Sequence, residues 1–361
     1  MLSRALLLLS ALASPSLGDE AASMAPLFSD LTQKFVPVGP VEVTSGILPE
    51  WLEFDRLVNG FGQYGGIIDG ENSTFFEFDY LFDVLSYVQS WNIKDGQVSY
   101  GHSMTKSTYY NQTVNGERPM LRSFGGTTPA LTPKEKMETI KATSVSDNYN
   151  VNIVDVGGKK FTISDTTGQV EIDPADLTTM SDFHYDDELD KQTMGIISCA
   201  HPTQLPNDPY MYNYQAQLFG NAPHHREGAH KLQFYRVDTT KEPLTREVMI
   251  DIDVQDLSYL HQFANTPNYL VLLHYPLFWQ VMGIATSTEI LPNMKWDASK
   301  GTKVQVIDKR TWTVTKEYTT DATFAYHHLN AYEEGDNVIV DILTNICDES
   351  NGDASCDDMN K

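Results

Sequence analysis

The sequence is poor in cysteine and in basic residues. Its 361 residues include three cysteines, Cys199, Cys347 and Cys356, and this odd, sparse set is not a disulfide framework. Lysine and arginine number 25 against 49 acidic residues, which gives a net charge of −24. Because phosphate binding requires clustered positive charge, this balance argues against a nucleic-acid partner.

Long apolar runs and long helical periodicity are also missing. The apolar run near the N-terminus follows Arg4 and precedes small residues. It is too short to span a bilayer, and the pattern predicts a secretory signal peptide over residues 1–18. The alternative is a retained membrane anchor. A secretory route ends outside the cell or, in some algae, in a plastid reached through the endoplasmic reticulum. Two sequons, at Asn72 and Asn111, would be glycosylation sites on that route.

Short strands broken by turns make up most of the remaining sequence. Hydrophobic residues account for 41% and aromatic residues for 11%, which is enough for a sizeable core. The segment 154–163 predicts a hairpin with a Gly-Gly turn, and Asp95-Gly96 predicts a second turn. A short helix is predicted over 132–140. No repeat is sharp enough to count blades and no linker divides the chain, so we expect one all-β domain: a sandwich, a barrel or a propeller.

Three of the ten histidines lie beside apolar, strand-like segments at comparable intervals. They are His201, His261 and His327, separated by 60 and 66 residues. This spacing would place one histidine in each successive unit of a propeller, and neutral imidazole is a common ligand for iron, copper or zinc. A lone histidine at a strand end is more often a hydrogen-bonded polar group. The surroundings of His184, His224, His225 and His230 are polar and typical of the surface, whereas Cys199 sits in an apolar stretch typical of the core.

The segments around these histidines resemble motifs of the carotenoid cleavage oxygenases. That family includes retinal-forming, apocarotenoid-cleaving and retinoid-isomerising members. Residues 200–202 read Ala-His-Pro, residues 258–263 read Ser-Tyr-Leu-His-Gln-Phe, and residues 326–334 read Tyr-His-His-Leu-Asn-Ala-Tyr-Glu-Glu. The entry motif at 46–52, Gly-Ile-Leu-Pro-Glu-Trp-Leu, is similar too. The resemblance runs in order from about residue 25 to 345, and the collinear set is far more specific than any one motif.

The resemblance implies a seven-bladed β-propeller with a helical and loop cap over an apolar tunnel. It implies four histidines on one Fe(II) ion and dioxygen-dependent cleavage of a polyene double bond to two carbonyl products. The iron ligands carried over are His201, His261 and His327, the last chosen over His328 because it lies three residues before Asn330. Asp165 falls where the family usually has a glutamate that orients a histidine ligand, and its side chain is one methylene shorter.

The main departure from the family is the fourth ligand, which lies well beyond the third motif in relatives. No histidine follows His328 here, so we expect residues 25–361 to form a partial propeller domain that is incomplete at its C-terminal end. The expected partners are a carotenoid or apocarotenoid, dioxygen and, peripherally, a membrane surface. Two alternatives stay open: a retinoid isomerase-like enzyme, and a non-catalytic carotenoid-binding remnant that lacks the fourth ligand.

Overall fold

The computed structural model describes most of the chain between residues 35 and 344. The described residues are 35–41, 48, 51–62, 77–78, 83, 85–115, 124, 127–128, 131–142, 146–189, 197–218 and 230–344. The predicted signal peptide, Asn72, His224, His225, Cys347 and Cys356 lie outside them and stay predictions. Among the described helices, none combines the length and apolar character needed to cross a membrane.

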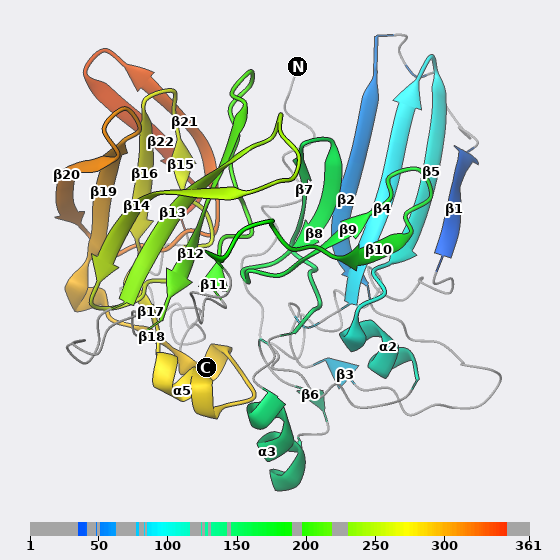
Figure 1. The fold of residues 1–361 in the computed structure, drawn as a ribbon, viewed down its shortest axis with the longest axis horizontal. Helices are drawn as coiled ribbons and strands as arrows, with labels where there is room; N and C mark the ends of the chain where they lie inside the picture. The colour runs from blue at the N-terminus through cyan, green and yellow to red at the C-terminus, as the bar shows by residue number, and fades with distance from the viewer. Residues whose placement is uncertain are drawn as a thin grey trace, which may run out of the picture.

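Four antiparallel sheets of four strands each carry most of the described residues (Figure 1). The first two sheets have the orders β1-β5-β4-β2 and β10-β9-β8-β7. Their strands are β1 Phe35–Val41, β2 Phe54–Gly62, β4 Leu85–Lys94, β5 Gln97–Met104, β7 Asn152–Val156, β8 Lys159–Ile163, β9 Gln169–Ile172 and β10 Thr179–Asp182.

The third and fourth sheets have the orders β11-β12-β13-β14 and β15-β16-β19-β20. Their strands are β11 Ile197–Ser198, β12 Tyr210–Gln217, β13 His230–Asp238, β14 Arg246–Val254, β15 Ala264–Asn265, β16 Tyr269–His274, β19 Thr302–Asp308 and β20 Thr313–Thr320.

Three two-stranded sheets and a few short helices complete the described fold. The pairs are β3 Glu77–Phe78 with β6 Thr127–Thr128, β17 Leu277–Trp279 with β18 Met294–Trp296, and β21 His328–Glu334 with β22 Asn337–Ile342. The helices are α2 Thr108–Val114, α3 Pro133–Ala142 and α5 Val281–Thr286, with 3₁₀ turns at Leu291–Asn293 and Ala298–Lys300. Figure 1 shows α2, α3 and α5 together at one end of the strands.

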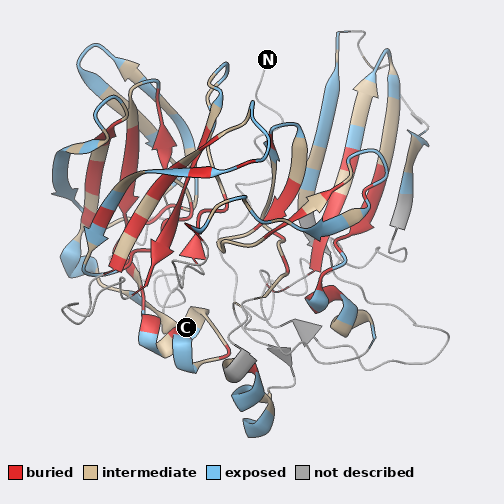
Figure 2. Cartoon of the chain, in the orientation of Figure 1, coloured by how far each residue is buried: buried red, intermediate tan, exposed pale blue. Residues whose placement is uncertain are grey.

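The core lies between successive sheets and not inside any one of them (Figure 2). Val88 of the first sheet packs with Val170 and Ile172 of the second. The largest cluster joins the third and fourth sheets. The packing of consecutive four-stranded antiparallel sheets confirms the all-β prediction, but no described strand closes the array into a ring, so the count of seven blades stays a prediction.

The two predicted hairpin turns are confirmed, and both depend on left-handed backbone. Asp95 and Gly96 have φ values of 51° and 72° between β4 and β5, and Gly157 and Gly158 have values of 63° and 81° between β7 and β8. Positive φ at both central residues is the geometry of a type I′ turn, which suits the twist of the strands. A Cβ atom at Gly157 would also lie 3.0 Å from the carbonyl oxygen of Thr239.

The helix predicted over 132–140 is confirmed as α3, Pro133–Ala142. Its start is a capping box: Thr132 N donates to Glu135 Oε2 at 2.7 Å, and Glu135 N donates to Thr132 Oγ1 at 3.3 Å. The sequence did not predict α2 and α5, which have seven and six residues. Segments this short show no helical period.

Candidate metal centre

Three histidine side chains meet where three successive strand units converge. His201 follows β11, His261 lies three residues before β15, and His327 immediately precedes β21. The Nε2 atom of His201 lies 3.0 Å from Nε2 of His261 and 3.3 Å from Nε2 of His327. The nitrogen atoms that the three rings offer all lie within 4.8 Å of one another. The fold therefore gathers the three histidines that the sequence singled out.

The spacing of these nitrogens fits one transition-metal ion. With metal–nitrogen bonds of about 2.1 Å, two imidazole ligands are about 3.0 Å apart at a right angle and about 3.4 Å apart at a tetrahedral angle. The separations of 3.0 and 3.3 Å lie in this range. An all-imidazole set suits iron, copper, zinc or nickel, so the donors fit iron without selecting it.

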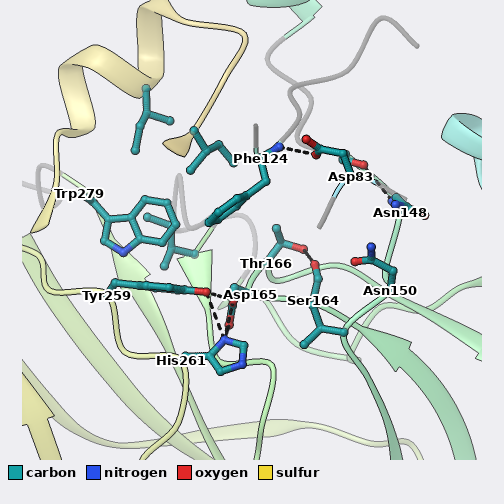
Figure 3. A pocket seen from close by; sticks show the side chains of 15 residues that line it. Asp83, Phe124, Asn148, Asn150, Ser164, Asp165, Thr166, Tyr259, His261 and Trp279 are labelled. Atoms are coloured by element: carbon teal, nitrogen blue, oxygen red, sulfur yellow. Dashed lines mark hydrogen bonds and ion pairs between the residues drawn. The ribbon is translucent and has the colours of Figure 1, made fainter. Parts of the chain in front are cut away.

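The Asp165 carboxylate holds the far side of the His261 ring (Figure 3). His261 Nδ1 lies 2.8 Å from Oδ2 and 3.0 Å from Oδ1 of Asp165. Because the carboxylate accepts a hydrogen bond from Nδ1–H, it favours the tautomer that leaves Nε2 free for a metal. The aspartate is one methylene shorter than the usual glutamate, yet it contacts the histidine directly.

Two further donors meet the same carboxylate. The Tyr259 hydroxyl donates to Oδ2 of Asp165 at 2.7 Å, and the Ala200 amide donates to Oδ1 at 3.1 Å. Burial raises the pKa of Asp165, but the electrostatic interaction with His261 and the hydrogen bonds from His261, Tyr259 and Ala200 outweigh it, so the net pKa is lowered. Burial and the nearby Asp165 raise the pKa of Tyr259 well above its ordinary value, so its hydroxyl stays protonated.

His201 is held as a neutral imidazole. Burial, followed by the proximity of His261 and His327, lowers the pKa of His201 to about 3. Its Nδ1 atom lies 3.3 Å from Nδ2 of Asn152, which also donates to the carbonyl of Ala200 at 3.0 Å. At neutral pH this ring is therefore uncharged, so a metal ion that binds it does not compete with an imidazolium proton.

Gln262 ties the third histidine segment to the second. The His328 amide donates to Oε1 of Gln262 at 2.9 Å, and Nε2 of Gln262 donates to the His328 carbonyl at 3.5 Å. Nε2 of His328 lies 3.3 Å from the Tyr275 hydroxyl, outside the cluster. Of the two adjacent histidines, His327 is therefore the one that joins the other two.

The remaining described histidines lie outside the cluster, and one differs from expectation. His184 is exposed, as predicted, and Cys199 is buried, as predicted. His230, expected in a solvated loop, is the first residue of β13 and is only 7% exposed. The prediction was wrong because the polar residues before it end where the apolar alternation of β13 begins. His274 is buried and pairs with Oε1 of Gln305 at 2.8 Å.

A cavity of about 100 Å³ adjoins the cluster, and His261, Asp165 and Tyr259 form part of its wall. Figure 3 shows Phe124 and Trp279 on one side and Asn148, Asn150 and Ser164 on the other. Ile284 and Ile290 extend the apolar side. The cavity therefore presents an apolar surface next to one of the three histidines. It is smaller than the 300–1,000 Å³ that usually holds a whole small molecule.

Comparison with protein families identifies the chain. Residues 28–360 match the sequence profile of the RPE65 family, described as retinal pigment epithelial membrane protein. The chain belongs to this family. Its members include the carotenoid cleavage oxygenases that the sequence motifs resemble. The match extends from the segment before β1 to the C-terminal tail, so it includes all three histidines and Asp165.

The relatives and structural neighbours agree with this membership. Human β,β-carotene 15,15′-dioxygenase is 27% identical over 83% of this chain. The chloroplastic carotenoid cleavage dioxygenase 8 of Arabidopsis thaliana is 24% identical over 87%. A glutamate-to-aspartate variant of the Synechocystis apocarotenoid oxygenase shares the fold with a TM-score of 0.66 and 18% identity, over 88% of this chain and 62% of its own. The chain spans a little over half the length of its curated relatives: 56% of the human protein and 54% of the plant protein.

Sequence reasoning missed three residues that shape the site. Tyr259 and Gln262 lie within the second motif, on either side of His261, and Asn152 lies in the first strand of the second sheet. A tyrosine two residues before a predicted ligand lies on the same side of an extended segment, which is a usable signal. Contacts of Gln262 with His328 and of Asn152 with Ala200 span 66 and 48 residues, and nothing local in the sequence indicates them.

Proposed function

We propose that this chain forms the metal-binding part of a non-haem Fe(II) dioxygenase that cleaves a double bond of a carotenoid or apocarotenoid to carbonyl products. The observation that carries the proposal is the convergence of three Nε2 atoms, one of them on a ring fixed by a buried carboxylate. The names of the relatives, carotene and carotenoid dioxygenases, support the substrate class and the reaction. We further propose that the four sheets and the β21–β22 hairpin are successive blades of the propeller.

The described residues would each contribute one physical task. His201, His261 and His327 would hold Fe(II). Bound iron supplies the dioxygen chemistry that amino-acid side chains lack. Asp165 holds the proton on Nδ1 of His261, and the low pKa of His201 keeps that ring neutral. The apolar wall formed by Trp279 and Phe124 would exclude water and hold the part of the polyene nearest the iron.

A non-catalytic carotenoid-binding role is the second candidate. It is favoured by the number of ligands, because the described residues bring three histidines together and not four. A retinoid isomerase-like activity, the alternative that the sequence resemblance leaves open, would use the same cluster without consuming dioxygen. Entry into the secretory route and peripheral membrane contact remain proposals as well.

The test is conversion of a carotenoid by the Fe(II)-reconstituted chain. We expect loss of visible absorbance with matching oxygen uptake, and one iron per chain by metal analysis. His261→Ala should abolish both iron retention and conversion, whereas His184→Ala, at an exposed histidine, should leave both unchanged. Absorbance shifts without oxygen uptake would favour the binding role. Conversion of a retinyl ester without oxygen uptake would favour the isomerase.

A further inference from the structure

The side chain of Tyr259 is held both by buried aromatic packing and by a hydrogen bond. Its ring is only 4% exposed and lies against Trp279, Phe324 and Tyr326, with ring centroids 5.2, 6.1 and 6.1 Å away. These three neighbours fix the direction of the phenol. They aim its hydroxyl at one place, the carboxylate of Asp165, 2.7 Å away.

The hydroxyl and the histidine approach the same carboxylate oxygen. Oδ2 of Asp165 lies 2.7 Å from the Tyr259 hydroxyl and 2.8 Å from Nδ1 of His261. The hydroxyl is itself 3.2 Å from that Nδ1 atom. The three groups therefore form a closed triangle in which both protein donors share one acceptor, and the position of any one of them limits the other two.

A short carboxylate needs such an anchor more than a long one does. Asp165 lies two residues after the end of β8, and its side chain reaches a histidine that is 96 residues further along the chain. Its other oxygen is held by the Ala200 amide at 3.1 Å. Besides His261, the Tyr259 hydroxyl donates to one carboxylate oxygen and the Ala200 amide donates to the other. These two hydrogen bonds fix the carboxylate plane, so it cannot turn away from His261.

We propose that Tyr259 is a positioning residue: its hydroxyl holds Asp165 against Nδ1 of His261 and so keeps Nε2 of His261 free and directed at the other two histidines. The inference rests on the proposed function, since it takes His261 as a metal ligand. It adds to that function a role for the Tyr259 hydroxyl, which compensates for the short side chain of Asp165 by holding its carboxylate in place.

The experiment is Co(II) titration of the metal-depleted protein, followed by absorption spectroscopy of the bound ion. We expect Tyr259→Phe, which keeps the ring and its packing, to weaken Co(II) binding about 10-fold, the lower end of effects at residues that orient ligands. The matched control is Tyr275→Phe, which removes a hydroxyl from another buried tyrosine that contacts His328 and not the cluster. It should change the affinity less than about 2-fold.

Rescue separates positioning from packing. In the Asp165→Glu background the carboxylate reaches further, so loss of the Tyr259 hydroxyl should cost less than about 3-fold in affinity. An equal loss in both backgrounds, or none in the native one, would overturn the inference.

A metal-free measurement keeps the inference apart from the proposed function. Long-range spectra of ¹⁵N-histidine-labelled protein should show His261 protonated on Nδ1, and Tyr259→Phe should shift part of the population to the other tautomer. An unchanged His261 spectrum overturns the inference even if the metal binds. If the native chain takes up no Co(II), the proposed function fails, and the His261 spectrum alone decides whether the hydroxyl positions the ring.

Discussion

The histidine cluster has two parts that are held differently. His201 and His261 form the first half, and His327 with the hairpin after it forms the second half. His261 is 5% exposed, and Asp165 holds both its ring and the Ala200 amide next to His201. His327 is exposed and precedes the β21–β22 hairpin, which is tied to the second segment by Gln262 beside His328 and, further along, by Glu333, which accepts hydrogen bonds from Thr266 and Asn268. The first half is therefore organised before any metal arrives, whereas the ties of the second half hold β21 and the backbone beside His327, and not the His327 ring itself. Preorganised ligands lose less entropy on binding and so contribute more to affinity.

Removing one histidine from each half should give the largest contrast. We expect His261→Ala to lower Fe(II) or Co(II) affinity more than 100-fold, because the ring and its fixed tautomer are lost together. His327→Ala should cost about 10-fold, since the exposed ring has more freedom to lose on binding. Metal titration monitored by absorption checks both values. Equal losses would show that the two halves contribute alike.

Removing the carboxylate should damage the first half even without metal. Asp165→Ala leaves Nδ1 of His261, the Tyr259 hydroxyl and the Ala200 amide without their acceptor. Because an unsatisfied buried donor costs about 1–3 kcal/mol, we expect the free energy of unfolding to fall by about 3 kcal/mol after partial relaxation. Urea unfolding of the metal-free protein measures it. Asp253→Ala, at an exposed position of β14, is the control and should change stability by less than about 0.5 kcal/mol.

A buried histidine outside the cluster separates the effect of burial from that of ligation. Burial lowers the pKa of His274 to about 4 from an ordinary value of 6.5. Between these values the unfolded chain binds more protons than the folded one, so the stability from this group is full above pH 6.5, falls as the pH drops from 6.5 to about 4, and changes no further below that. The shift corresponds to about 3 kcal/mol. His274→Gln should remove this part of the pH slope in urea unfolding between pH 7 and 4. His184→Gln, at an exposed site, should keep the slope.

The sequence could predict the features that depend on local motifs, but not those that depend on contacts between distant residues. His201, His261 and His327 were predictable because each lies in a local motif with a recognisable order, and the type I′ turns were predictable because Asp95-Gly96 and Gly157-Gly158 carry their own signal. The contact of Asp165 with His261 joins residues 96 apart, and the partner of Gln262 lies 66 residues away. Such contacts follow from how whole sheets pack, and no local pattern encodes that packing.

The prediction for His230 was wrong for a related reason. Its neighbours before it are polar and suggested a loop, whereas its burial is set by register: His230 pairs with Val254 across β13 and β14. Because side chains alternate between the two faces of a strand, the register of the pair decides which face is buried. The number of blades stays a prediction for the same reason, since closure is a property of the whole ring and not of one hairpin.

The weakest predicted effect tests the Gln262 link, which is the tie of the second half that lies beside His327. Gln262→Ala removes the acceptor of the His328 amide and the donor to its carbonyl. We expect a loss of about 1 kcal/mol, the net value of such hydrogen bonds, seen as a three- to six-fold drop in metal affinity. Hydrogen exchange localises the change: the His328 amide should exchange faster, whereas the Ala200 amide, held by Asp165, should keep its protection. If both amides lose protection together, the two halves of the cluster form one cooperative unit. In that case His261 and His327 differ in exposure but not in how firmly the protein holds them.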